Sequence, residues 1–229
     1  MFNVIKNSIK NNLKKFKFIR LLLYKIRPGY KKYQVFDFLS KDSIFIDIGA
    51  NIGEVTDYIN DKTGCKIFCY EPHPGAFNYL KNKLKNKDNI FTFNYAVSDK
   101  DSEQDFYLHK DSLDSGEIKY SQASSLESDK ENISQNKKIT VKSIHINNIL
   151  KKFEKIDCIK IDIEGHEYKI LPFLIENKNL IKKVVCELHG SNSKFSQKIK
   201  NPQYKPKYDY LISVLKKENL YNSWFIEWE

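Results

Sequence analysis

The sequence contains little glycine and proline, and it has no long apolar run. Its 229 residues include 8 glycines and 6 prolines, which excludes collagen-like and low-complexity chains. The longest apolar run, 19–26, contains Arg20 and Lys25 and is shorter than the roughly 18 residues of a membrane-spanning helix. No small-residue cleavage site follows it, so we expect no secretory signal and a cytoplasmic protein. A hydrophobic content of 41% predicts a globular chain.

Cysteine is also scarce, and its spacing excludes a clustered metal site. The four cysteines Cys65, Cys69, Cys158 and Cys186 form no CxxC pair, and each lies in or beside an apolar run. Structural zinc needs Cys or His ligands at short spacing. We therefore expect reduced thiols that are buried as small hydrophobic side chains.

Acidic residues are absent from the first 36 positions. This segment carries ten basic residues, and the remaining chain has 29 basic and 29 acidic residues, so the formal charge of +10 belongs to the N-terminus. A neutral body does not favour a nucleic-acid partner. Apolar side chains recur at spacings of three and four within 2–26, which predicts an amphipathic helix. It either packs on the domain or makes a peripheral membrane contact through residues 1–27.

Apolar runs alternate with helical patterns along the rest of the chain. The predicted strands are 44–48, 66–70, 90–95, 158–163, 184–188 and 224–228. The predicted helices are 54–60, 76–85, 146–153 and 208–218. This alternation predicts an α/β fold with a parallel sheet and right-handed crossovers. We expect an N-terminal helix and connector over 1–36 and one domain over 37–229. A polar insert at 99–140 would form an antiparallel excursion.

A candidate ligand site follows the first two predicted strands. Ligands of a parallel sheet bind beyond the carboxyl ends of its strands. The first strand leads into the loop Asp47–Gly53, where Gly49 and Gly53 let the backbone approach a ligand and a helix N-terminus follows. The second strand ends in Glu71, a carboxylate suited to bind both hydroxyls of a ribose. Loop and carboxylate together favour a nucleoside-containing cofactor over a plain turn with a helix cap.

The residues of the loop also indicate which nucleoside-containing cofactor binds. A dinucleotide site has three glycines in the pattern GxGxxG, whereas here Asn51 replaces the middle glycine and Asp47 precedes the loop. A carboxylate repels a pyrophosphate but attracts the amino group of S-adenosylmethionine. The loop therefore favours methyl transfer over an NAD-linked oxidoreductase.

Several motifs, in the same order, resemble those of FkbM-type methyltransferases. They are 45–53, 70–74, 96–99, 124–126, 159–167 and 187–189. The run from Ile159 to Glu167 (IKIDIEGHE) is the most specific. The resemblance covers residues 44–190 and departs from the family at Asn147, where an acidic residue is usual.

The resemblance implies a class I, Rossmann-like methyltransferase fold with a mostly parallel seven-stranded sheet, helices on both faces and S-adenosylmethionine as donor. Carried over by position, Glu71 would bind the ribose. The methionine part would be held by Asp47, Gly49, Asn51 and Gly53, and the adenine would be flanked by Ala96, Val97 and Ser98. Family members mostly methylate hydroxyl oxygens, so we expect a sugar, polysaccharide or related natural product as acceptor.

Candidate catalytic residues follow the fourth and fifth predicted strands. Methyl transfer needs an aligned acceptor and a group that removes its proton. His189 is the preferred base, because an unperturbed histidine has a pKa of about 6.5, and Asp162 and Glu187 lie at the same edge. In an alternative mechanism Asp162 and Glu187, with His189, bind Mg²⁺ or another divalent cation. Structural alternatives are Asp162 as the N-cap of a helix beginning near Glu167, and His189 as a cap at a strand end.

The remaining histidines and aromatics have simpler interpretations. His73 is expected to shape the turn after the second strand, and His109 and His145 to lie on the surface. The C-terminal aromatics favour a core role over a sugar-stacking one; they are Tyr204, Tyr208, Tyr221, Trp224 and Trp228. An enzyme and a non-catalytic cofactor-binding module of the same fold both remain open. The oligomeric state has no signature in the sequence.

Overall fold

The computed structural model describes residues 30–112, 118, 121–130, 132–189 and 204–228, together with Leu21, Tyr24 and Lys25. The predicted helix over 2–26 therefore lies almost wholly outside the described residues, as does the membrane contact assigned to 1–27. Among the helices of the described part, none has the length and apolar character needed to cross a bilayer.

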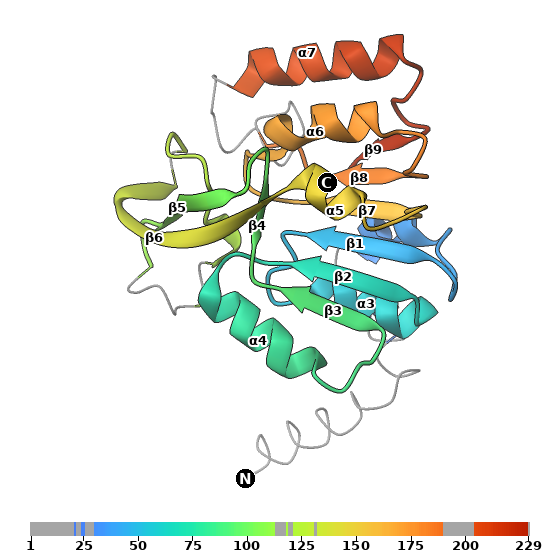
Figure 1. Ribbon diagram of the computed structural model, residues 1–229, viewed down its shortest axis with the longest axis horizontal. Helices are drawn as coiled ribbons and strands as arrows, with labels where there is room; N and C mark the ends of the chain where they lie inside the picture. Colours follow the sequence, from blue (N-terminus) through green and yellow to red (C-terminus); the bar gives the residue numbers. More distant parts are fainter. Residues whose placement is uncertain are drawn as a thin grey trace.

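Six parallel strands form the central sheet, in the order β3-β2-β1-β7-β8-β9 (Figure 1). Their bounds are β1 (Ile44–Ile48), β2 (Lys66–Tyr70), β3 (Ile90–Phe93), β7 (Cys158–Ile161), β8 (Val184–Cys186) and β9 (Phe225–Glu227). The chain first builds outward from β1 to β3 and then returns to place β7 beside β1. Strand order thus reverses between β1 and β7, which is where such sheets bind ligands. The predicted α/β, Rossmann-like class is confirmed.

The expected count of seven strands is wrong for the described residues. The sequence itself has six strand-like runs, and all six are strands of the sheet. After helix α7 (Tyr204–Lys217) the described chain adds only β9, which pairs in parallel with β8. The seventh strand was implied by the family resemblance alone.

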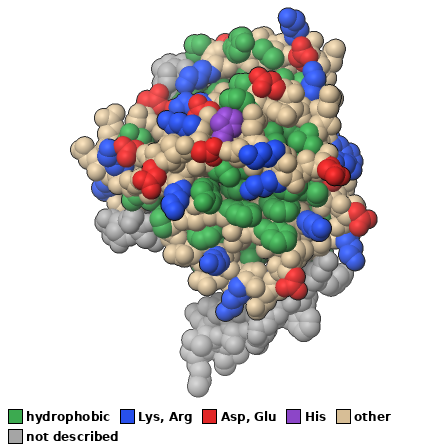
Figure 2. Space-filling model, viewed as in Figure 1, with side chains coloured by type: hydrophobic (Ala, Val, Ile, Leu, Met, Phe, Trp, Pro, Cys, Tyr) green, Lys and Arg blue, Asp and Glu red, His purple; other side chains and the backbone are tan. Residues whose placement is uncertain are grey.

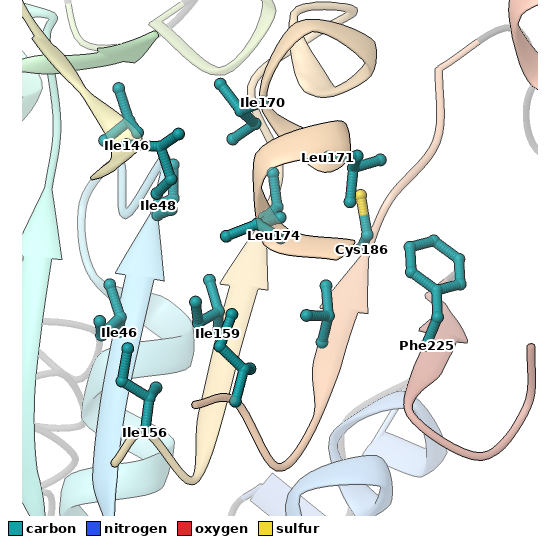
Figure 3. Close-up of a cluster of buried hydrophobic side chains, with 14 of the residues drawn as sticks. Ile46, Ile48, Ile146, Ile156, Ile159, Ile170, Leu171, Leu174, Cys186 and Phe225 are labelled. Atoms are coloured by element: carbon teal, nitrogen blue, oxygen red, sulfur yellow. The ribbon is translucent and has the colours of Figure 1, made fainter. Parts of the chain in front are cut away.

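Helices cover both faces because side chains alternate along each strand. On one face α3 (Glu54–Thr63), α4 (Pro74–Leu84) and the 3₁₀ helix η1 (Tyr30–Phe36) pack against Phe45 and Ile67. On the other, α5 (Ile146–Leu150), α6 (Glu167–Glu176) and α7 cover the second core. Figure 3 shows Ile46 of β1 and Ile159 of β7 on this second face, with Leu174 of α6 nearby.

All four cysteines are buried free thiols. The prediction that they act as core residues is therefore confirmed.

The second face is less completely covered over β2 and β3. Apolar side chains gather there on the surface in Figure 2. Phe91 is 42% exposed and stacks on Phe68, which also makes an edge-to-face contact with Phe153. The cause is the shortness of α5, which has five residues and cannot extend across these strands.

The predicted antiparallel excursion is confirmed as a three-stranded sheet of order β4-β6-β5. It consists of β4 (Ala96–Ser98), β5 (Ser102–His109) and β6 (Ile133–His145), with β5 antiparallel to β6. The segment 121–130, here called the insert segment, begins with the 3₁₀ helix η2 (Ser121–Ala123) and precedes β6. The small sheet lies beyond the carboxyl ends of the central strands (Figure 1).

Helix ends correct three expectations. Helix α6 has His166 at its N-cap position without a side-chain hydrogen bond, so Asp162 does not cap it. His145 is a cap and not a free surface residue, since its Nδ1 accepts a hydrogen bond from the amide of Asn147 at the start of α5. Helix α7 begins at Tyr204 and not at 208 because Pro206 lies in the first turn, where a missing N–H costs nothing.

Two other expectations about side chains are confirmed. His73 shapes the turn after β2 as the N-cap of α4, accepting from the amide of Ala76. Among the C-terminal aromatics, Tyr204, Trp224 and Trp228 are buried, and Tyr208 and Tyr221 are half-buried against the second core.

Candidate active site

A cavity of about 270 Å³ lies at the carboxyl edge of the central sheet. Its wall includes Glu71 after β2, Asn51 after β1, Asp162 after β7 and Glu187 after β8. The insert segment closes the side away from the sheet, contributing Ser121 among others. The fold therefore brings the ends of four neighbouring strands to one cavity, at the point where strand order reverses.

The loop after β1 is shaped by two glycines with positive φ. Gly49 has φ +76°, and a Cβ there would lie 1.8 Å from the carbonyl oxygen of Asp162. Gly53 also has φ +76°, and its Cβ would lie 2.5 Å from Cδ1 of Leu80. The amides of Gly49 and Ala50 both donate to the carbonyl of Tyr70, at 3.0 and 3.1 Å. Gly49 and Ala50 line the cavity, whereas Gly53 lies behind it and makes the turn into α3.

Glu71 lies in the cavity wall with its carboxylate held by the backbone. Its Oε2 accepts from the amide of Asn51 and its Oε1 from the amide of His73, both at 2.8 Å. Burial raises the pKa of Glu71 to about 7, and the two amide hydrogen bonds oppose that shift. Each oxygen keeps a second lone pair that can accept from a ligand.

The side chain of Asn51 carries an unsatisfied acceptor. Its Nδ2 donates to Oγ of Ser121 at 2.8 Å, but its buried Oδ1 has no hydrogen-bond partner among the described residues. Asn51 itself has φ +47°. A buried polar atom without a partner is costly, and this one belongs to a residue of the cavity wall, so it is suited to a ligand donor.

Lys160, which the sequence reasoning did not single out, lies at the centre of the site. Its Nζ donates to the carbonyl of Gly49 at 2.8 Å and lies 3.3 Å from Asp47 and 3.7 Å from Asp162. Burial alone would lower the pKa of Lys160, but Asp47 and Asp162 raise it above its usual value. The sequence does contain a signal for this role, because Lys160 lies inside a strand whose other residues are apolar. A charge in a strand that is covered on both faces needs a buried partner.

Asp47 does not line the cavity, unlike its predicted role as a direct contact of the cofactor. It is fully buried, and its Oδ2 accepts from Oγ1 of Thr56 at 2.7 Å. Its remaining oxygen faces Lys160. Asp47 therefore acts on the cavity through Lys160.

Asp162 and Glu187 both line the cavity, as the sequence predicts. Burial raises the pKa of Asp162. Burial also raises the pKa of Glu187 to about 7, and the nearby charge of Asp162 adds to that shift. Glu187 is thus a carboxylate that exchanges its proton near neutral pH.

His189 is not suited to the role of general base. Its Nδ1 lies 2.9 Å from Glu167 and its Nε2 3.2 Å from Glu164, so both ring nitrogens face carboxylates. Burial would lower the pKa of His189, but these two carboxylates raise it well above the usual value. With each ring nitrogen held against a carboxylate, neither nitrogen faces an acceptor hydroxyl. His189 also lies outside the cavity wall.

One acidic cluster among the described residues has the spacing of a divalent-cation site. Ligand atoms of Asp162, Glu164 and His189 lie within 4.8 Å of one another, a set that differs from the predicted pair of Asp162 and Glu187. However, the carboxylate of Glu164 already forms ion pairs with Lys130 and His189. The paired charges hold the pKa of Glu164 at about 2, against the effect of burial. A divalent ion here would compete with the ammonium of Lys130 for Glu164 and would need the neutral form of His189.

Of the three residues predicted to flank adenine, Ala96 and Val97 line the cavity and Ser98 does not. Ser98 is fully buried, and its Oγ lies 2.9 Å from Nε2 of His166. The other ring nitrogen of His166 lies 2.6 Å from Oε1 of Glu127 in the insert segment. Ser98 therefore helps to fix β4 and the insert segment against the start of α6.

The insert segment also holds the loop before α6. Oγ of Ser125 donates to the carbonyl of Glu164 at 2.8 Å, and the ammonium of Lys130 pairs with its carboxylate. Glu164 has φ +59°, a strained conformation for a residue with a side chain. Contacts from the insert segment thus stabilise the most specific motif of the sequence.

Comparison with known proteins agrees with this geometry. The model of a family described as the methyltransferase FkbM domain matches residues 47–222. The hexuronic acid methyltransferase AglP of Haloferax volcanii is 24% identical over 153 residues, covering 66% of this chain and 57% of the relative. The 2-O-methyltransferase NoeI of Sinorhizobium fredii is 24% identical over 148 residues, covering 60% of each chain. This chain thus spans somewhat more than half the length of these relatives.

Among solved structures, an rRNA methylase from Streptococcus thermophilus is similar over 83% of this chain and 79% of its own. The sequence identity is 10% and the TM-score 0.43, a similarity too loose to carry a conclusion about function. The family match, by contrast, covers most of the chain and contains the loop after β1, Glu71, Asp162 and Glu187. The chain belongs to the FkbM methyltransferase family.

Proposed function

We propose that this chain is an S-adenosylmethionine-dependent O-methyltransferase that acts on a hydroxyl group of a sugar or glycan. The observation that carries the proposal is the single cavity that joins Glu71 and Asn51 on one side to Asp162 and Glu187 on the other. One side suits a nucleoside with an amino-acid tail and the other suits proton removal from an acceptor. The names of two relatives, a hexuronic acid methyltransferase and a 2-O-methyltransferase, support an oxygen acceptor.

The residues of the cavity fit the donor. Glu71 would accept hydrogen bonds from the ribose, and the unpaired Oδ1 of Asn51 would accept one from the amino group. Gly49 lets the backbone come close, while Ala96 and Val97 provide apolar contact for the base. When bound, S-adenosylmethionine supplies a methyl group on a positively charged sulfur. The carboxylates of the wall favour that charge, because opposite charges attract strongly in a site shielded from water.

Glu187 is the proposed general base. It lines the cavity beside Asp162, and its pKa of about 7 leaves it partly ionised at neutral pH. In the reaction the acceptor hydroxyl would lose its proton to the Glu187 carboxylate while its oxygen forms the new bond to the methyl carbon. The methyl–sulfur bond breaks at the same time, its electron pair stays on the sulfur, and neutral S-adenosylhomocysteine leaves. Lys160 pairs with Asp162 and Asp47 and so holds both carboxylates in position beside the loop after β1.

A thermal-shift titration tests the donor. S-adenosylhomocysteine at 100 times its dissociation constant should stabilise the protein by about 2.7 kcal/mol, whereas NAD⁺ should give no shift. The opposite pattern would support the NAD-linked alternative. A non-catalytic module would bind S-adenosylhomocysteine but transfer no methyl group to any glycoside. Glu187→Gln distinguishes the enzyme from the non-catalytic module. The substitution should lower the rate of methyl transfer in an enzyme, whereas a non-catalytic module has no such rate.

A further inference from the structure

One end of the cavity is built by residues outside the region that matches the family. Lys32 and Tyr33 of η1 and Trp228 after β9 line it, whereas the family match covers 47–222. The two segments are tied together, because Nε1 of Trp228 donates to the carbonyl of Lys32 at 2.9 Å. This end of the cavity therefore lies outside the residues that match the family model.

The strand order shows which end this is. The amide of Trp228 donates to the carbonyl of Cys186 at 2.8 Å, so Trp228 lies beside the end of β8, next to Glu187. Glu71 lies at the end of β2, three strands from β8 in the sheet. At about 4.8 Å between strands, Glu71 is roughly 14 Å from the proposed base. Lys32 and Trp228 therefore lie at the acceptor end, opposite the ribose end.

Lys32 differs from the other cation of the cavity wall, Lys160. Lys160 is buried and paired with Asp47 and Asp162. Lys32 is exposed and forms no ion pair with any described residue. Its Nζ lies 4.6 Å from the ring centre of Trp228 and 5.8 Å from that of Tyr33. Contact with an indole face favours this position of the ammonium. A cation that can bind an anionic group of the acceptor therefore lies at the acceptor end.

Apart from Lys160, which is paired with Asp47 and Asp162, and His166, the charged side chains in the rest of the wall are acidic, so the two ends of the cavity differ in charge. The wall contains the carboxyl groups of Glu54, Glu71, Asp162, Glu164 and Glu187. An acceptor that carries a negative group would be repelled by this side and attracted to Lys32. Such an acceptor would enter with its anionic group at Lys32 and a hydroxyl toward Glu187.

We infer that Lys32, held by Trp228, is a specificity-determining residue that selects acceptors with a carboxylate or phosphate close to the methylated hydroxyl. The inference rests on the proposed function and names the substrate class of the same site. An ammonium binds either anion by charge-assisted hydrogen bonds. Trp228 is 6% exposed, so it positions the ammonium and offers little surface for stacking a sugar.

The test compares pairs of acceptors that differ in one anionic group. p-Nitrophenyl β-glucuronide and p-nitrophenyl β-glucoside share the sugar ring and the aglycone and differ at C6. The pair of glucose 6-phosphate and glucose tests recognition of a phosphate. In the wild type we expect a lower KM for the anionic member of a pair. Lys32→Gln should raise that KM about tenfold, which corresponds to about 1.4 kcal/mol. It should leave kcat and the KM of the neutral member unchanged, and Lys32→Arg should keep most of the preference.

Lys31→Gln is the matched control, because Lys31 is a neighbouring exposed lysine outside the cavity wall. If Lys31→Gln and Lys32→Gln had equal effects, the preference for anionic acceptors would come from the overall positive charge of this region. That result would overturn the inference. Methylation without any preference for the anionic acceptors would also overturn it, while leaving the proposed function intact. Failure to bind S-adenosylhomocysteine would instead contradict the proposed function.

A binding experiment covers the case in which none of these acceptors is methylated. Saturation-transfer NMR on the protein loaded with S-adenosylhomocysteine should detect glucuronate or glucose 6-phosphate, and the signal should fall in Lys32→Gln but not in Lys31→Gln. If the loaded wild type binds neither anion, or binds glucose equally well, the inference is wrong.

Discussion

Replacing Lys160 with methionine would remove the cation between Asp47 and Asp162 while keeping a side chain of similar length. Asp47 is fully buried and would keep only its hydrogen bond from Thr56. Removing one partner of a buried ion pair costs about 3–5 kcal/mol, because the other charge is left unpaired. The carbonyl of Gly49 would also lose its donor. The lost contact with Asp162 contributes less to the free-energy cost, because the side chain of Asp162 is 29% exposed and keeps part of its contact with water.

We therefore expect Lys160→Met to lower the free energy of unfolding by about 4 kcal/mol. For a chain of this size that corresponds to a fall in Tm of roughly 8–16 °C. Urea unfolding followed by circular dichroism measures the free energy. Lys138→Met is the matched control, because Lys138 pairs with Asp105 on the surface, where both side chains are more than 40% exposed. That variant should keep nearly the same midpoint.

A double mutant tests the physical reason. If the cost comes from an unpaired buried carboxylate, Asp47→Asn added to Lys160→Met should recover part of the lost stability, since it removes the unpaired charge. A double mutant less stable than Lys160→Met would refute the reasoning. A loss from Lys160→Met no larger than that from Lys138→Met would refute it as well.

Three further predictions concern the base, the buried imidazole and the loop. Glu187→Gln should lower kcat about 10²–10⁴-fold and leave the affinity for S-adenosylhomocysteine unchanged. The wild-type rate should rise with pH through about 7 as Glu187 ionises. A rate that does not change through that pH would contradict the role of Glu187 as the base. His189 has a folded-state pKa above its unfolded value of about 6.5, so its contribution to stability is complete below pH 6.5 and is lost as pH rises through the folded pKa. Urea midpoints from roughly pH 6 to 9 should therefore converge between wild type and His189→Gln, and parallel curves would show that the imidazole is not charged. Gly49→Ala should be far more destabilising than Gly64→Ala, because both glycines have positive φ but only the Cβ at Gly49 meets another atom within 4 Å, at 1.8 Å; similar losses in thermal unfolding would show that the loop relaxes.

Some features of the site were predictable because their signals are local. Apolar runs bounded by polar turns gave the six strands, since a strand buried on both faces is recognisable from its own residues. The spacing of Gly49, Asn51 and Gly53 after β1, and the place of Glu71 at the end of β2, predicted a ligand site at the carboxyl edge. The structure places Gly49, Asn51 and Glu71 in the wall of one cavity. Their contacts with the donor stay predictions that the titration above tests.

What the sequence determined by itself is thus the set of strands, the loop after β1 and the family motifs. The carboxylate partners of His189, the pairing of Lys160 and the place of Lys32 were decided by the tertiary structure. His189 looked like a base until the fold placed Glu164 and Glu167 on its two nitrogens. The bond from Trp228 to Lys32 joins residues 196 positions apart. The charge state of a side chain depends on the groups that surround it in space, and residues distant in sequence become neighbours only when the strand order is complete.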